Sequence, residues 1–317
     1  MAILDHVGQL RSSSLKDDPA YAGLVRANLA FGNVISHCEI PICDFEGHIG
    51  LQPWPLILPH DMARVLLQNG HRKYLGAGTA AFWRNMSCHF GVEKPGTEKD
   101  EAIGLQLYGD EGEIFKGIQY MALHWSSENS PYFTDARRAK YLIALIPVSR
   151  YAMHGKINLT LESIMAVVVR SCNLWFHQDV CGLYGAVTTL KGDWKFLTQV
   201  LCLKRTPNTD AFCFLCMGTK SLAVPATDLS QSAEWKVQVP AKPWHQDPEV
   251  FHLENFSLGL VGIDVLHCFH LGIGRDVVAS CLVILLRTHA FAGSTAPWLI
   301  KLFDPYFQSM YMFAINF

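Results

Sequence analysis

The feature that most constrains the fold is an alternation of strand-like apolar runs with one long helical pattern. Residues 102–111 alternate apolar with small or polar side chains, and residues 141–148 have the length and content of a central strand. Residues 156–183 then place apolar side chains at helical spacing, and residues 187–190 are again β-prone before a second helical pattern starts at Trp194. Strands alternating with helices in this way predict an α/β core.

Outside this region the chain is predicted to be helical at first and irregular later. Residues 60–70 and 79–90 have helical patterns, the first with Asn69-Gly70 as a stop signal. Residues 205–260 are interrupted by prolines, which indicates an insertion or a long loop region.

Composition limits the classes of function. The chain is 50% hydrophobic and 17% charged, with a formal net charge of −2. It shows no stripe of basic residues, which argues against DNA binding by charge alone. The first residues contain no apolar signal-peptide region, so the ten cysteines are predicted to be reduced thiols. The late apolar run 277–286 is too short to span a bilayer. We therefore expect an intracellular protein without a transmembrane helix or a membrane partner.

Two aspartates each follow a glycine after a predicted strand, Asp110 in Tyr108-Gly109-Asp110 and Asp193 in Gly192-Asp193. Carboxylates held rigidly at the ends of neighbouring strands can share divalent metal ions that activate water in phosphodiester cleavage. The alternative is that Gly-Asp simply forms a turn after each strand.

A second candidate site combines two half-sites for zinc. Cys213 and Cys216 form a CxxC motif that can hold Zn²⁺ from a tight turn, and His267 and His270 would share one helical face. The alternatives are that the cysteines are small buried hydrophobes, and that Asp264 caps a helix whose histidines have no ligand role.

Taken together these motifs resemble eukaryotic DDE transposases, especially CACTA (En/Spm)-like elements and genes derived from them. Asp110 and Asp193 match the first two acids of that family, and a CxxC motif after the second acid matches Cys213 and Cys216. The DxxH signature of these families, which lies before the final Glu, matches Asp264 and His267. The resemblance covers about residues 100–290.

The resemblance implies an RNase H-like core with a largely helical or irregular insertion after the strand of the second Asp. It also implies hydrolysis and strand transfer on DNA with Mg²⁺ or Mn²⁺ at Asp110 and Asp193, and a nuclear location. The chain departs from the pattern because no Glu follows His267. We therefore expect a catalytic-core fragment that is inactive for want of the third acidic ligand. The expected organisation is a helical region at 1–100, the first part of the core at 101–204, and an insertion at 205–317 within which the chain ends before the core is complete.

Two other hypotheses about function are compatible with the sequence. One is a non-catalytic interaction protein on the same scaffold, stabilised by zinc at Cys213 and Cys216. The other is an unrelated α/β enzyme in which His124, His154 and His177 are acid–base residues, although no catalytic triad or phosphate-loop motif accompanies them. A homo-oligomer is compatible with any of these.

Overall fold

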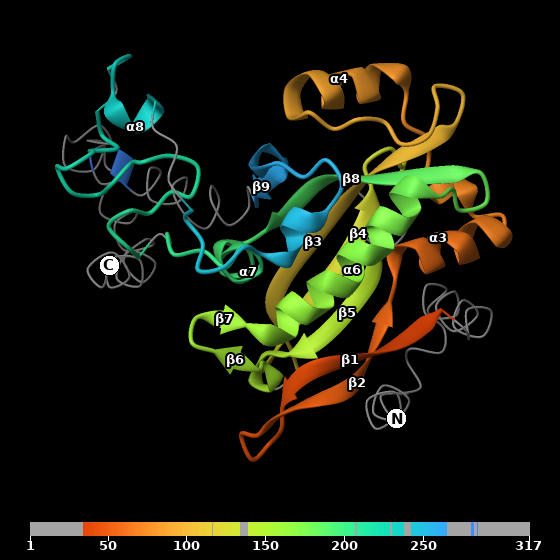
Figure 1. Cartoon of the computed structure of the whole chain (residues 1–317), viewed down its shortest axis with the longest axis horizontal. Helices are drawn as coiled ribbons and strands as arrows, with labels where there is room; N and C mark the ends of the chain where they lie inside the picture. Colours follow the sequence, from red (N-terminus) through yellow and green to blue (C-terminus); the bar gives the residue numbers. More distant parts are fainter. Residues whose placement is uncertain are drawn as a thin grey trace, which may run out of the picture. The chain divides into compact units, whose positions relative to one another are not determined.

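The centre of the chain is a mixed sheet of five strands in the order β5-β4-β3-β8-β9 (Figure 1). The structure is a computed structural model, and it describes residues 34–115, 117–133, 139–206, 208–228, 230–237 and 242–264, with 280, 281 and 284. The chain divides into two compact units between Ile263 and Asp264. The strands are β3 (Glu101–Phe115), β4 (Ile118–Ser127), β5 (Tyr141–Pro147), β8 (Leu183–Gly192) and β9 (Val261–Ile263).

The sheet confirms the predicted α/β class. Neighbours β3, β4 and β5 are antiparallel, whereas β8 runs parallel to β3 and β9 runs parallel to β8. The strands expected at 102–111, 141–148 and 187–190 are all present as parts of β3, β5 and β8. Strands β4 and β9 were not expected from the sequence patterns.

Two helices cover one face of this sheet. Helix α6 (Leu159–His177) begins at Asn158, whose side chain accepts the N–H of Leu161, and it packs on β8. Helix α7 (Trp194–Val200) follows β8 directly. By length and composition α6 could cross a membrane, but ten of its side chains are buried in the protein, as expected for a core helix.

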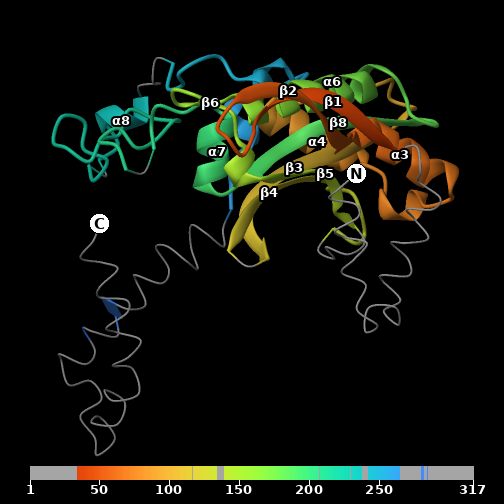
Figure 2. The same cartoon turned by 90° about the horizontal axis from the view of Figure 1, so that it is seen from below.

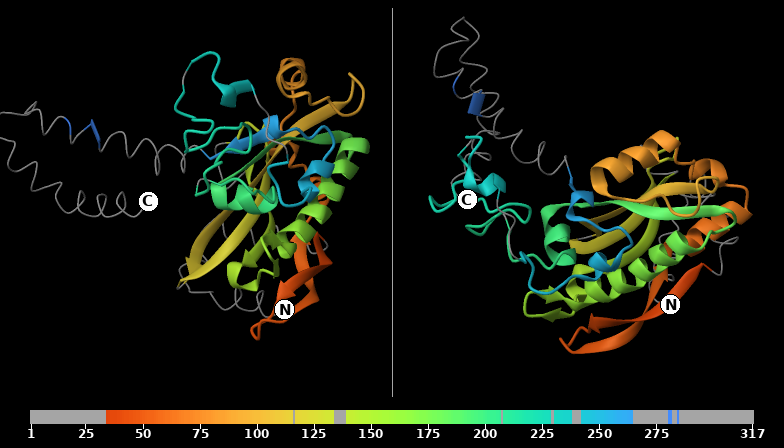
Figure 3. Two further views of the ribbon diagram at one scale, coloured as in Figure 1. Left: turned by 60° about the vertical axis from the view of Figure 1, so that its left-hand side comes forward. Right: turned by 45° about the horizontal axis from the view of Figure 1, so that its top comes forward.

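The segment before β3 combines a hairpin with two helices. Strands β1 (Ile35–Cys43) and β2 (Ile49–Ile57) pair antiparallel, followed by α3 (Pro59–Gln68) and α4 (Ala80–Phe90). Both helices were expected, but a purely helical description of residues 1–100 is wrong because of the hairpin. Alternate residues Ile40, Ile42, Trp54 and Leu56 are buried, which is the strand period. The hairpin lies on the same side of the sheet as α6 (Figures 2 and 3).

The region after α7 is irregular, as predicted. An isolated antiparallel β-bridge pairs Leu203 with Trp244. The irregular segment lies between these two residues. Backbone hydrogen bonds from Lys204 to Pro243 and from His245 to Cys202 flank this bridge. The short elements are β6 (Met153–His154), β7 (Ile157–Asn158), α8 (Glu234–Val237), and the 3₁₀ turns η1 (Arg72–Tyr74), η2 (Val148–Arg150), η3 (Glu249–His252) and η4 (Leu258–Leu260).

Candidate functional site

Asp110 and Asp193 follow a pair of matched glycines on adjacent parallel strands. Gly109 of β3 is the register partner of Gly192 of β8, and each aspartate is the next residue along its chain. Neighbouring strands lie about 4.8 Å apart, so the backbones of the two aspartates are neighbours at one level of the sheet. The pairing of the two Gly-Asp motifs is therefore a property of the fold, not only of the sequence.

The glycines are required because one aromatic ring lies on both of them. A Cβ atom at Gly109 would lie 2.1 Å from Cε2 of Phe196, and one at Gly192 would lie 2.3 Å from its Cδ1. Phe196 belongs to α7 and is fully buried. The absence of side chains on both strands allows α7 to pack closely beside the two aspartates.

The two carboxylates are held differently. Asp193 is the N-cap of α7, and its Oδ1 accepts the backbone N–H of Phe196 at 2.7 Å. Its local role is therefore to start a helix, whereas the alternative predicted from the sequence was a turn. Asp110 lies within β3, which continues to Phe115, so the expectation that both strands end in Gly-Asp is wrong for β3. Pairing of Asp110 with Ala122 and of the following residues with β4 extends the strand.

The side chain of Asp110 lies on the face of the sheet opposite to that of Gly109 and Glu111. Because side chains alternate along a strand, and Gly109 faces Phe196, Asp110 faces the side of the sheet opposite α7. Asp110 is partly buried, and its partner on β4 is the small residue Ala122. The carboxylate thus lies on a sheet face where its neighbour on β4 takes little space.

Glu111 was not singled out from the sequence, although it is the most buried acid next to the aspartates. Its side chain is 4% exposed and forms an ion pair with Lys195 of α7. Its Oε1 also accepts hydrogen bonds from the Tyr151 hydroxyl at 3.2 Å and from Gln199 Nε2 at 3.4 Å. These interactions connect β3 with α7, the helix that Asp193 caps.

The surroundings of Tyr151 raise the pKa of its phenol. Burial raises the pKa of the phenol strongly, and the negative charges of Glu111 and Asp193 raise it further. Tyr151 therefore remains protonated and donates its hydrogen bond at any physiological pH. The signal for this network in the sequence is only the acid that follows Asp110.

Carboxylates arranged in this way suit a hard divalent cation. Mg²⁺ and Mn²⁺ prefer oxygen ligands and are commonly bound through one or two carboxylates. Oδ1 of Asp193 is engaged by the helix N-terminus, while its other oxygen has no hydrogen-bond partner among the described residues. The register places the backbones of Asp110 and Asp193 close together, and a cation shared by their carboxylates remains a prediction.

The CxxC motif forms a tight turn with its sulfur atoms close together. The N–H of Leu215 donates to Sγ of Cys213 at 3.4 Å, and the Arg205 guanidinium donates to the carbonyl oxygens of Cys213 and Cys216. Burial raises the pKa of Cys216, the N–H of Gly218 opposes this, and the neighbouring Cys213 thiol raises it again. A bound cation would relieve this crowding by favouring both thiolates.

The side chain between the cysteines anchors this turn to the core. Phe214 is 1% exposed, and its ring meets that of Trp194 edge-on at 5.7 Å. Trp194 is the first residue of α7 and follows Asp193. The CxxC turn is therefore packed against the residue next to the second aspartate.

The third motif is only partly described. Asp264 comes directly after Ile263, the residue of β9 that pairs with Gly192, and it is 8% exposed. His267 and His270 lie outside the described residues. The predicted Cys₂His₂ site thus remains a prediction.

The histidines of the alternative enzyme hypothesis lie on three separate elements. His124 is in β4, His154 is in β6, and His177 ends α6, where its Nε2 is 2.9 Å from the carboxylate of Glu254. Among the described residues no two of these histidines share a hydrogen-bond partner. This arrangement gives the hypothesis no support.

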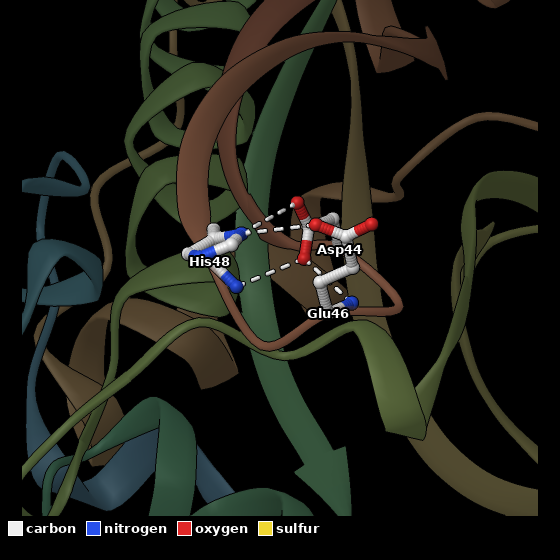
Figure 4. Close-up of side chains that lie close together, drawn as sticks. All are labelled: Asp44, Glu46 and His48. Carbon is white, nitrogen blue, oxygen red and sulfur yellow. Dashed lines mark hydrogen bonds and ion pairs between the residues drawn. The ribbon is translucent and has the colours of Figure 1, made fainter.

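A further group of ligand atoms was missed from the sequence. Asp44, Glu46 and His48 in the β1–β2 turn place their ligand atoms within 4.8 Å of one another (Figure 4). The N–H groups of Glu46 and His48 both donate to Oδ1 of Asp44 at 2.8 Å, and that of His48 contributes most to lowering the pKa of Asp44. These side chains could hold a metal ion, although Glu46 and His48 are exposed and Asp44 is partly exposed.

No protein-family model matches the chain, and no curated protein matches its sequence. Function is therefore inferred from the paired aspartates and the CxxC turn.

Proposed function

We propose that the chain is a transposase-derived protein whose Asp110 and Asp193 bind Mg²⁺ or Mn²⁺ for phosphodiester cleavage and strand transfer on DNA. The observation that carries the proposal is the register pairing of Gly109 with Gly192, which makes the backbone of Asp110 in β3 a neighbour of the backbone of Asp193 at the start of α7. A cation bound there would activate the attacking water and stabilise the leaving oxygen.

The order of the strands supports an RNase H-like core. Three antiparallel strands are followed by two that run parallel to the first of them, and α6 connects the two groups. An RNase H-like core has this order, with its acids on the first strand and after the fourth. The location of Asp110 on β3 and of Asp193 after β8 supports this proposal.

The residues present have distinct tasks in this proposal. Asp110 and Asp193 supply oxygen ligands, α7 orients Asp193 through its N-terminal amide, and the Glu111–Lys195 ion pair fastens α7 to β3. Two acids give a cation fewer protein ligands than the family's three, and no Glu follows His267 in this sequence. We therefore expect cation binding with weak or no cleavage by this chain.

Isothermal titration calorimetry of the full chain with Mn²⁺ tests the proposal. The chain should carry Glu46→Gln and His48→Asn throughout, because the β1–β2 turn could bind the same ion. Asp110→Asn with Asp193→Asn should remove one binding event from this background. An unchanged stoichiometry would refute the aspartate site, and Asp100→Asn, on an exposed loop, is the matched control.

A cleavage assay on labelled DNA tests the expected loss of activity. We expect no Mg²⁺-dependent product above that of the Asp110→Ala variant. Cleavage that depends on Mg²⁺ and disappears in Asp110→Ala would show that two acids suffice, and would overturn the expectation of an impaired site.

A second candidate function is a non-catalytic, zinc-stabilised interaction protein on the same scaffold. The observation that favours it is the CxxC turn, where Leu215 already donates its N–H to the sulfur of Cys213. Metal analysis of purified protein should find zinc that Cys213→Ser with Cys216→Ser abolishes, while the exposed control Cys88→Ser retains it. Tight zinc without aspartate-dependent Mn²⁺ binding would favour this second function.

DNA as a partner and the nucleus as a location belong to the first proposal, and self-association is compatible with both. Cross-linking of nuclear extracts and of the purified chain would test them separately.

A further inference from the structure

Tyr108, two residues before Asp110 on β3, belongs to a row of side chains that runs across the sheet. This row has no role in the site described so far. Tyr108 of β3 pairs with His124 of β4 on one side and with Lys191 of β8 on the other. Side chains two apart on a strand share a face, so this row lies on the same face as Asp110. The Tyr108 and His124 rings are in contact, with centroids 4.8 Å apart.

A second lysine lies over the same row. Lys140 Nζ is 5.5 Å from the centroid of the Tyr108 ring, and Lys140 itself is exposed. Burial, with a smaller effect of the nearby Lys140, lowers the pKa of His124 to about 4. His124 is thus neutral at pH 7, and the positive charge of the row belongs to Lys140 and Lys191.

Both lysines are available to a ligand. Neither forms an ion pair within the described residues, unlike Lys195, which is held by Glu111. Glu128, an acid of the neighbouring loop, already accepts hydrogen bonds from Thr188 and Thr189. Lys191 is partly exposed, and its neighbour on β9 is Gly262, which has no side chain.

We propose that Lys140 and Lys191 bind two phosphates of the DNA strand that is cut at Asp110 and Asp193. This inference rests on the proposed function. The two lysines flank β3 and β4, since Lys140 precedes β5 and Lys191 is on β8, so their backbones are separated by roughly three strand spacings, about 14 Å. The row lies about 6.6 Å along the strand from Asp110, which places a bound strand of nucleic acid across β8, β3 and β4 next to the acids.

The salt dependence of binding tests the proposal on the full chain. Binding of a fluorescein-labelled single-stranded DNA oligonucleotide is followed by anisotropy in EDTA, from low to moderate salt. Each lysine that neutralises a phosphate contributes about 0.7 to the slope of log affinity against log salt. Lys140→Gln with Lys191→Gln should lower the slope by about 1.4, and Lys140→Arg with Lys191→Arg should keep it.

The chain offers a matched control. Lys73 also lies over a tyrosine ring, 5.2 Å from the centroid of Tyr74, but on the 3₁₀ turn η1. Lys73→Gln should leave the slope unchanged. A Lys140→Gln, Lys191→Gln chain that binds with the wild-type slope would overturn the proposal, as would an equal loss in Lys73→Gln. Circular dichroism checks that each variant is folded.

Failure of this inference is distinguishable from failure of the proposed function. Lys140→Gln with Lys191→Gln should keep the Mn²⁺ binding of the parent chain, whereas Asp110→Asn with Asp193→Asn should lose it and keep the salt slope. Loss of the slope effect with retained Mn²⁺ binding refutes the lysines alone. A lysine-dependent slope without aspartate-dependent Mn²⁺ binding refutes the metal site alone.

Discussion

The ring of Phe196 packs directly on Gly109, so that a methyl group on this glycine would lie 2.1 Å from the ring carbon Cε2. Phe196 is the third residue of α7, and Asp193 is the cap of that helix. The contact therefore ties the strand that carries Asp110 to the helix that orients Asp193. The geometry of the candidate site depends on a residue that has no polar atom in its side chain.

Gly109→Ala should destabilise the protein through this contact. The added methyl group must displace the fully buried Phe196, and overpacking of this kind costs about 1–3 kcal/mol or more. Urea unfolding measures the loss. Gly112→Ala is the control, because a Cβ at Gly112, on the same strand, meets nothing within 4 Å. Equal stability of the two variants would contradict the account.

Substitutions at Asp193 should separate its structural role from its metal role. Asp193→Ala removes the acceptor for the Phe196 N–H and should cost about 1 kcal/mol of stability. Asp193→Asn keeps an oxygen acceptor and should cost less, while both variants lose Mn²⁺ binding. Thermal unfolding and Mn²⁺ titration on the same samples check this. An Asn variant that binds Mn²⁺ like the parent would remove Asp193 from the metal site.

The Glu111–Lys195 ion pair should show strong coupling. Lys195→Met leaves the buried carboxylate of Glu111 without its cation, which should cost about 1–3 kcal/mol. Adding Glu111→Gln should restore part of the stability, because the remaining amide is neutral. A double-mutant cycle from urea unfolding measures the coupling, and Lys195→Arg serves as the charge-retaining control. Additive effects would show that the pair contributes nothing together.

His124 should make stability depend on pH in a defined direction. Its pKa in the folded protein is about 4, below the ordinary value of 6.5, so the unfolded chain binds more protons between these values. The free energy of unfolding should therefore fall as pH is lowered through 6.5 toward 4, by about 2 kcal/mol between pH 7 and 5 from this residue. His124→Phe should flatten that part of the profile.

The NMR signal of the His124 ring gives a direct check. Its ring protons should keep their chemical shift between pH 7.5 and 5.5. Titration of His124 near its ordinary pKa would contradict the burial argument. A wild-type profile in the His124→Phe variant would assign the pH dependence to other groups.

Local patterns in the sequence were sufficient for several elements. The alternation in 102–111, the helical spacing in 156–183 and the Asn69-Gly70 stop are each set by neighbours within a few residues, and β3, α6 and α3 follow them. Strand β4 shows the same alternation, with Met121, Leu123 and Trp125 buried, but was overlooked. Its polar intervening residues belong to the face opposite α6.

The sequence by itself determined the α/β class and the two Gly-Asp motifs, because periodicity and turn chemistry act over short distances. Only the tertiary structure decided that Gly109 pairs with Gly192, that Phe196 covers both, and that Glu111 meets Lys195. Strand register between distant segments is selected by packing of the whole sheet against α6 and α7, and no local pattern encodes it. The placement of Asp110 beside Asp193 is therefore a consequence of that packing.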